Sequence, residues 1–113
     1  MNRRFARRIR PTVRGEFPDK VATVPDPELE QYLVRTINRA QSYGLETDND
    51  LTTFIRLTLT VSTEFDLRGI FHSILTDKTI PNHEKIEALF ERTNDEDWEE
   101  AVRPGLYAGR AFA

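Results

Sequence analysis

The sequence predicts an all-α domain, a compact bundle of four to six short helices organised on a central helical hairpin. Two observations lead to this prediction. Apolar residues recur at helical spacing through most of the 113 residues. Two such stretches also meet at a tight corner, Tyr43-Gly44-Leu45. A chain of this length forms one domain with one modest core.

The composition narrows the classes of protein that fit. Hydrophobic residues make up 38% and charged residues 31%, which is less apolar and more charged than an average domain but not the composition of a disordered chain. The chain has no cysteine, so disulfides and thiolate metal sites are excluded and a reducing compartment is permitted. No apolar run approaches the ~18 residues of a membrane span, and none follows the Arg-rich start as in a secretory signal. We expect a cytoplasmic protein without a membrane partner; an organellar transit peptide stays an open alternative.

Residues 1–24 are expected to form a basic N-terminal arm with a short helix. Its apolar side chains recur every fourth position: Phe5, Ile9 and Val13. Pro11 interrupts this stripe, so we expect a short or kinked helix that ends between Gly15 and Pro18. Residues 19–24 are expected to add a short turn.

The helical domain is expected to span residues 25–103. Its first long helix starts at Pro25-Asp26-Pro27, where Asp26 can cap and Pro27 suits the first helical position. The face expected to be buried has apolar residues at helical period: Leu29, Tyr32, Leu33, Ile37 and Ala40. Gly44 should end the helix with φ > 0, and Leu45 should fold back in a Schellman-type cap.

The second helix of the hairpin should begin at Thr47 or Asp48, where Thr47 and Asp50 have nearly the spacing of a capping box. Its apolar stripe is wide, which predicts the most buried helix: Leu51, Phe54, Ile55, Leu57, Thr58, Leu59 and Val61. The β-branched content of residues 58–61 leaves a strand as an open alternative.

Three shorter helices should follow. Asp66 can cap the first of them, and Pro81 can open the second. Asn94 or Asp95 should start the last, in which Trp98 closes the core, and residues 104–113 are expected to be a flexible tail. The side chains expected to point inward on the first two are Leu67, Ile70, Phe71, Ile74, Leu75, Ile86, Leu89 and Phe90.

No catalytic, metal or cofactor site is predicted. His72 and His83 lack the spacing of metal ligands, and no P-loop, GxGxxG or GxSxG motif occurs. Four acidic residues could be drawn as a carboxylate cluster, but three of them lie near predicted helix starts, where capping explains them. These four residues are Asp48, Asp50, Glu64 and Asp66.

Charge is segregated along the chain. Six Arg and no acid lie in the first 14 residues, and six acids against one Arg lie between Glu91 and Glu100. Each run is most simply a solvated helix face. The Arg run could instead bind a protein or a nucleic acid, and the acidic run could pair with it within the fold or in an antiparallel dimer. The candidate partner-binding residues are Arg3, Arg4, Arg7, Arg8, Asp95, Glu96, Asp97, Tyr107 and Phe112.

A running pattern of residues extends through the hairpin and beyond it. It reads R-A-x-x-Y-G-[LI]-x-x-[ED]-x-D-[LIV]-x-x-[FY]-[LIV]-x-L, then F-D, I-L-x-D and K-[IM]-x-x-L-[FY]. The matching residues are Arg39-Ala40, Tyr43-Gly44-Leu45, Asp50-Leu51, Phe54-Ile55, Leu57, Phe65-Asp66, Ile74-Leu75, Asp77, Lys85-Ile86 and Leu89-Phe90.

By this pattern the chain resembles small all-helical bacterial proteins encoded near type VI secretion spike (VgrG), effector and chaperone genes. The resemblance covers about residues 15–92. Pro11, the stretch at residues 61–64 and the tail after Asp95 depart from the pattern. The resemblance implies a non-enzymatic accessory protein, a co-chaperone or adaptor that binds an effector, its chaperone or a spike protein. It implies no catalytic residue and no cofactor.

Two alternatives remain open beside that expectation. An immunity protein that neutralises a cognate toxin would aim the acidic run at a basic active site. A nucleic-acid-binding protein would use the Arg arm, although the sequence pI of about 5.4 argues against it. A homodimer is compatible with each of them.

Overall fold

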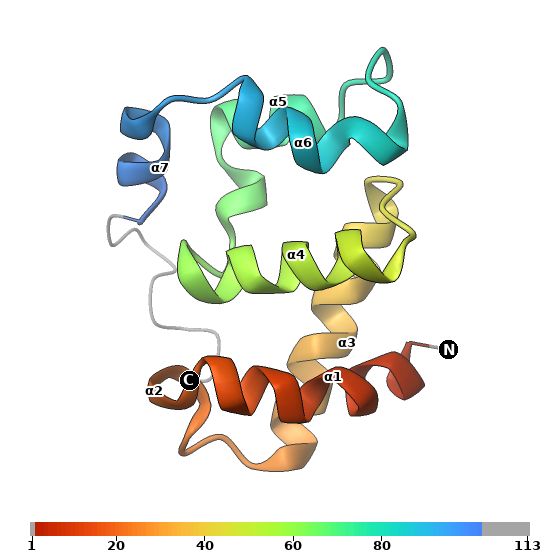
Figure 1. The fold of residues 1–113 in the computed structure, drawn as a ribbon, viewed down its shortest axis with the longest axis vertical. Coiled ribbons are helices and arrows are strands. Elements are labelled where there is room, and N and C mark those ends of the chain that lie inside the picture. Colours follow the sequence, from red (N-terminus) through yellow and green to blue (C-terminus); the bar gives the residue numbers. More distant parts are fainter. Residues whose placement is uncertain (1, 103–113) are drawn as a thin grey trace.

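The computed structural model describes residues 2–102, which form seven α-helices and two short 3₁₀ helices and no strand (Figure 1). The all-α prediction is confirmed, and residues 58–60 belong to a helix rather than a strand. The helix count exceeds four to six because the stretch expected as a turn after Phe17 forms a short helix of its own. The elements are α1 (Arg3–Glu16), α2 (Pro18–Val21), α3 (Asp26–Ser42), α4 (Asp48–Thr60), η1 (Phe65–Leu67), α5 (Gly69–Leu75), η2 (Asn82–Glu84), α6 (Lys85–Glu91) and α7 (Asp95–Val102).

The helices are stacked around α4. Figure 1 shows α1 at one end, α4 in the middle and the α5–α6 pair at the other end, with α3 crossing behind α1 and α4. Helix α3 contacts both α1 and α4, and α4 also contacts α6. Six of the thirteen residues of α4 are buried, in agreement with its wide apolar stripe. No helix within residues 2–102 combines the length and the apolar character of a membrane span.

The corner between α3 and α4 is a Schellman cap, as predicted. Gly44 has a φ of 91°, a conformation that favours glycine. The Gly44 N–H donates to the Gln41 carbonyl at 2.9 Å, and the Leu45 N–H donates to the Ala40 carbonyl at 3.2 Å. Leu45 is fully buried, so the chain leaves the helix with an apolar anchor.

Two of the helix starts predicted from polar side chains are also confirmed, those of α4 and α7. The Thr47 hydroxyl accepts the N–H of Asp50 at 3.1 Å at the start of α4. At the start of α7 the capping is reciprocal: the Asp97 N–H donates to Asn94 Oδ1, and the Asn94 N–H donates to Asp97 Oδ2, both at 2.9 Å. These side chains satisfy backbone donors that a helix start otherwise leaves unpaired.

Helix α1 continues through Pro11 instead of breaking there. Pro11 is exposed, so the carbonyl one turn earlier, which loses its N–H partner, can be hydrated. Ala6 and Val13 on the opposite side are buried. Burial of that stripe therefore holds a helix that the local sequence alone would interrupt, and the N-terminal arm is packed on the domain.

The part of the core between α4 and α5 is built from aromatic rings. The Phe54 and Phe65 centroids lie 5.3 Å apart, and those of Phe65 and Phe71 lie 5.8 Å apart. Three residues predicted to point inward do not: Leu67 is 55% exposed, Phe90 52% and Ile70 39%. The helix expected at Asp66 begins only at Gly69, after a 3₁₀ turn, which changes the register of Leu67 and Ile70.

Candidate functional site

The arginines of α1 clamp the start of α3. The Arg7 guanidinium donates to Glu30 Oε1 at 3.1 Å, and that of Arg10 donates to Glu30 Oε2 at 2.6 Å. The Glu30 side chain is 19% exposed, so these contacts neutralise a carboxylate that is largely removed from water. The Arg-rich segment thus acts within the fold.

Arg14 binds the chain just before α3. It donates to the carbonyls of Val21 and Val24 at 3.0 and 2.7 Å and to the Asp26 carboxylate at 2.6 Å. Asp26 was predicted to cap α3, and that prediction is wrong. Pro25 occupies the cap position, and no side chain caps this helix end. The hydrogen bond from Arg14 lowers the pKa of Asp26; burial partly opposes this, and the charges of Arg10 and Arg14 add smaller lowering effects.

Asp26→Asn should reduce the acid sensitivity of the fold. Because the pKa of Asp26 is lowered in the folded state, the unfolded chain takes up that proton first as the pH falls. The contribution of Asp26 is therefore present above about pH 5 and lost as the pH falls below about 4. Melting temperatures measured from pH 2.5 to 7 by circular dichroism should decline less steeply below about pH 4 in the variant.

The control is Asp19→Asn. It removes an exposed carboxylate of α2 that makes no ion pair with residues 2–102. If Asp26→Asn and Asp19→Asn give the same acid dependence, Arg14–Asp26 does not contribute as described.

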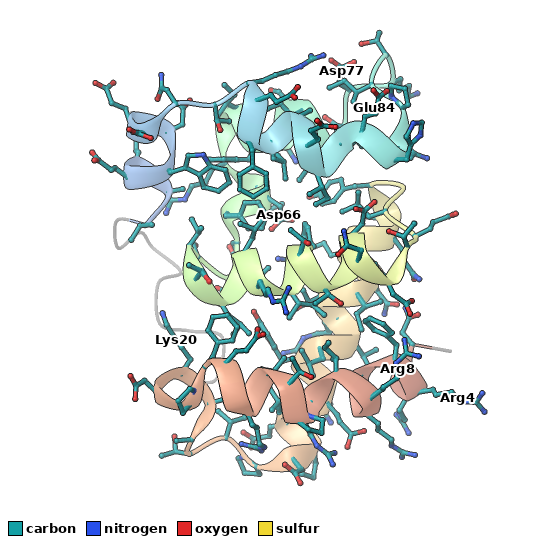
Figure 2. The ribbon with its side chains drawn as sticks, in the orientation of Figure 1. Arg4, Arg8, Lys20, Asp66, Asp77 and Glu84 are labelled. Atoms are coloured by element: carbon teal, nitrogen blue, oxygen red, sulfur yellow. The ribbon has the colours of Figure 1, made fainter. Side chains whose placement is uncertain are left out.

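Of the four arginines predicted to bind a partner, two are engaged in ion pairs. Arg7 contacts Glu30, and Arg8 donates to Asp48 at 2.7 Å in an exposed pair. Arg3 and Arg4 form no ion pair with the described part of the chain, and Arg4 extends away from the molecule (Figure 2). Pairing of this cluster with the acidic run does not occur within residues 2–102, where the arginines contact acids of α3 and α4.

A buried polar network lies between α3 and η1. The Asp66 carboxylate, fully buried, accepts two hydrogen bonds from Arg39, both at 2.8 Å, and one from the Tyr43 hydroxyl at 2.8 Å. Arg39 also donates to the Thr63 carbonyl at 2.6 Å. Figure 2 shows Asp66 between α4 and the α5–α6 layer. The prediction that Asp66 caps a helix is wrong, because its carboxylate faces these donors instead.

The network extends to α6 and includes four residues of the pattern: Arg39, Tyr43, Asp66 and Lys85. Lys85 is 6% exposed, and its ammonium donates to the Tyr43 carbonyl at 2.7 Å. Burial raises the pKa of the Tyr43 hydroxyl, and the hydrogen bond to Asp66 raises it further. Arg39, Tyr43, Asp66 and Lys85 are thus one structural unit. Every buried side-chain polar atom in the described chain has a hydrogen-bond partner.

The described residues contain no group of three or more side chains placed to hold a metal ion. His72 lies at the network, with its Nδ1 3.2 Å from the Asp66 carbonyl, and His83 is exposed on η2. Asp48 and Asp66, drawn together in the predicted carboxylate cluster, bind different arginines.

The most distinctive surface lies on the end formed by η1, α5, α6 and α7. Its exposed large apolar side chains are Leu67, Ile70, Phe90 and Val102. Phe90 stacks on Trp98 with centroids 5.4 Å apart, and Trp98 contacts Phe71 at 4.7 Å. Trp98 is packed against the core, as predicted, but Phe90 covers its outer side rather than entering the core.

A groove of about 430 Å³ lies between α5 and α7. Ile70 and Phe71 line it from α5, and Asp97, Glu100 and Ala101 line it from α7. The predicted acidic residues Asp95, Glu96 and Asp97 all belong to α7. No carboxylate of α7 forms an ion pair with a cation among residues 2–102. Tyr107 and Phe112, the other predicted contacts, lie outside the described residues.

Comparison of the chain with protein-family models, with curated proteins and with solved structures found no match.

Proposed function

We propose that this protein is a non-enzymatic accessory that binds another protein through the end formed by η1 and α5–α7. The observation that supports the proposal is the position of its exposed large apolar side chains. In the described chain all of them, from Leu67 to Val102, belong to this end, and none belongs to α1–α4. Single exposed apolar residues are ordinary, but several of them confined to one end of a molecule favour a protein-binding surface there.

The basic end is less suited to an external partner. Four of its six arginines already bind acids of the same chain, so a partner would have to compete with those ion pairs. At the opposite end the α7 carboxylates have no such competitor among residues 2–102. This contrast favours protein binding at α5–α7 over nucleic-acid binding by the Arg arm.

The resemblance of the hairpin pattern to proteins encoded near type VI secretion genes gives the class of partner. In this proposal the protein acts in the cytoplasm as a co-chaperone or adaptor for a secreted effector or for its chaperone. Its rigid α3–α4 hairpin and buried Arg39–Asp66 pair hold the binding end in place and do not contact the partner.

Co-expression with the products of the neighbouring genes tests this function. A tagged full-length chain should retain an effector, an effector chaperone or a spike protein through affinity and size-exclusion steps. The Phe90→Ser variant should retain less of it, whereas Glu28→Gln at the other end should retain as much as the wild type. The proposal fails if none of these neighbours is retained by the wild type.

An immunity protein is the second candidate. The carboxylates of α7, which form no ion pair within residues 2–102, favour it, because they would complement a basic active site. Co-expression should then restore the growth of cells that produce the cognate toxin. Retention of the toxin without restored growth would instead indicate an adaptor.

A further inference from the structure

We infer that the groove between α5 and α7 binds a protein segment that inserts a large apolar side chain and carries Lys or Arg beside it. The inference rests on the proposed function and specifies the chemistry of its partner. It follows from the lining of the groove, from the charge around it and from the contrast with the other end of the molecule.

The lining provides an apolar floor. Phe71 and Ala101 are buried beneath the groove, and Ile70 is 39% exposed at its edge. The volume of about 430 Å³ is at the lower end of the range for ligand sites, and it suits one or two side chains of a partner better than a large cofactor. An inserted Leu, Phe or Trp would cover Ile70 and extend the row of aromatic rings from Phe71 to Trp98.

The charge around the groove is negative. Asp97 and Glu100 line it, and α7 carries three more acids: Asp95, Glu96 and Glu99. The one lining cation is Arg68, whose guanidinium lies 3.4 Å from the backbone carbonyl of Glu100. A basic partner segment is therefore attracted, and phosphates are repelled, which excludes a nucleic-acid backbone from this groove.

The other end of the molecule shows what such carboxylates do when a basic segment covers them. Glu30 and Asp26 of α3 form ion pairs with three arginines of α1: Arg7, Arg10 and Arg14. Helix α1 also buries apolar side chains against α3. The acids of α7 have no equivalent within residues 2–102. A basic amphipathic segment on α7 would complete the same kind of contact.

Three synthetic peptides of about 15 residues provide the probes, since a helix of that length can form in water. One places Leu at helical spacing with Lys elsewhere, the second replaces Lys by Glu, and the third replaces Leu by Ser. Each is labelled with fluorescein and titrated with the full-length protein, and anisotropy is measured. Only the Leu/Lys peptide should bind, and its affinity should fall as salt is raised.

Two variants locate the binding. Glu100→Lys should weaken the Leu/Lys peptide about ten-fold or more, and Ile70→Ser should weaken it about five-fold or more, with melting curves showing that each variant is folded. Glu28→Lys is the matched control, because it makes the same charge change on an exposed residue of α3, and it should alter binding less than about two-fold. The Glu100 variant keeps the test decisive if Ile70→Ser is unfolded.

The inference would be overturned if Glu28→Lys and Glu100→Lys had equal effects, or if the Ser/Lys peptide bound as tightly as the Leu/Lys peptide. Binding would then reflect the overall charge of the protein rather than the groove. A dimer in sedimentation equilibrium that Ile70→Ser and Glu100→Lys dissociate would overturn it in favour of a second copy. Tight binding by a peptide of residues 103–113, with none by Leu/Lys, would assign the groove to the chain itself. If a co-expressed neighbour is retained equally by both variants, the groove is not its site, although the proposed function stands.

Discussion

Replacing Arg39 by Met should destabilise the fold by about 3–5 kcal/mol, because it leaves a buried carboxylate without its cation. Asp66 is fully buried and receives two of its hydrogen bonds from Arg39. The same substitution removes the donor to the Thr63 carbonyl. A domain of this size is stable by only about 5–15 kcal/mol, so the variant should melt far below the wild type or be unfolded. Urea unfolding at pH 7 measures the change.

Two further variants test whether the burial of the Arg39–Asp66 pair is what makes its loss costly. Arg8→Met breaks the exposed pair with Asp48, whose side chains are 65% and 72% exposed, and should cost less than about 1 kcal/mol. The double variant Arg39→Met/Asp66→Leu removes both buried charges and should recover part of the loss. Recovery stays incomplete because the Tyr43 hydroxyl loses its acceptor. Equal costs for Arg8→Met and Arg39→Met would contradict the role assigned to burial.

Gly44→Ala should destabilise the fold by about 1–2 kcal/mol, mainly through backbone strain. The φ of 91° strains any side chain at this position. A Cβ there would also overlap the end of the Asn82 side chain, and this exposed side chain would have to turn aside. Thermal unfolding followed by circular dichroism gives the change in melting temperature.

Gly15→Ala is the matched control. A Cβ at Gly15 meets nothing within 4 Å, and the residue lies inside α1. This substitution should stabilise the protein by about 0.4–1 kcal/mol. Adding Asn82→Ala to Gly44→Ala should relieve the clash and leave the backbone strain. If Gly44→Ala melts at or above the wild-type temperature, the corner is not built as described.

The exposed apolar side chains of α5 and α6 illustrate what the sequence could not predict. The helical period predicted that Ile70 and Phe90 point inward. Helices α5 and α6 have only seven residues each, and these two side chains are exposed. In such short helices the apolar stripe identifies the apolar face. It does not say whether another helix covers the whole of that face. The available signal was the number of apolar residues in these two helices, which is more than helices this short can bury.

The roles of Asp26 and Asp66 show the same limit for polar residues. Both lie where a helix start was expected, and an acid near a helix start is usually explained by capping. Asp26 instead binds an arginine 12 positions earlier, and Asp66 binds one 27 positions earlier. Their positions in the sequence contain no information about those partners.

The sequence by itself determined the all-α class, the Gly44 corner and the capped starts of α4 and α7. These features depend on hydrogen bonds and steric limits among residues within about five positions of one another, which the order of residues specifies directly. The tertiary structure alone decided that α1 passes unbroken through Pro11, that its arginines clamp α3 and that the acids of α7 stay unpaired within residues 2–102. Those outcomes depend on which side chains meet across the fold, and such meetings are set by packing over long stretches of chain rather than by local propensity.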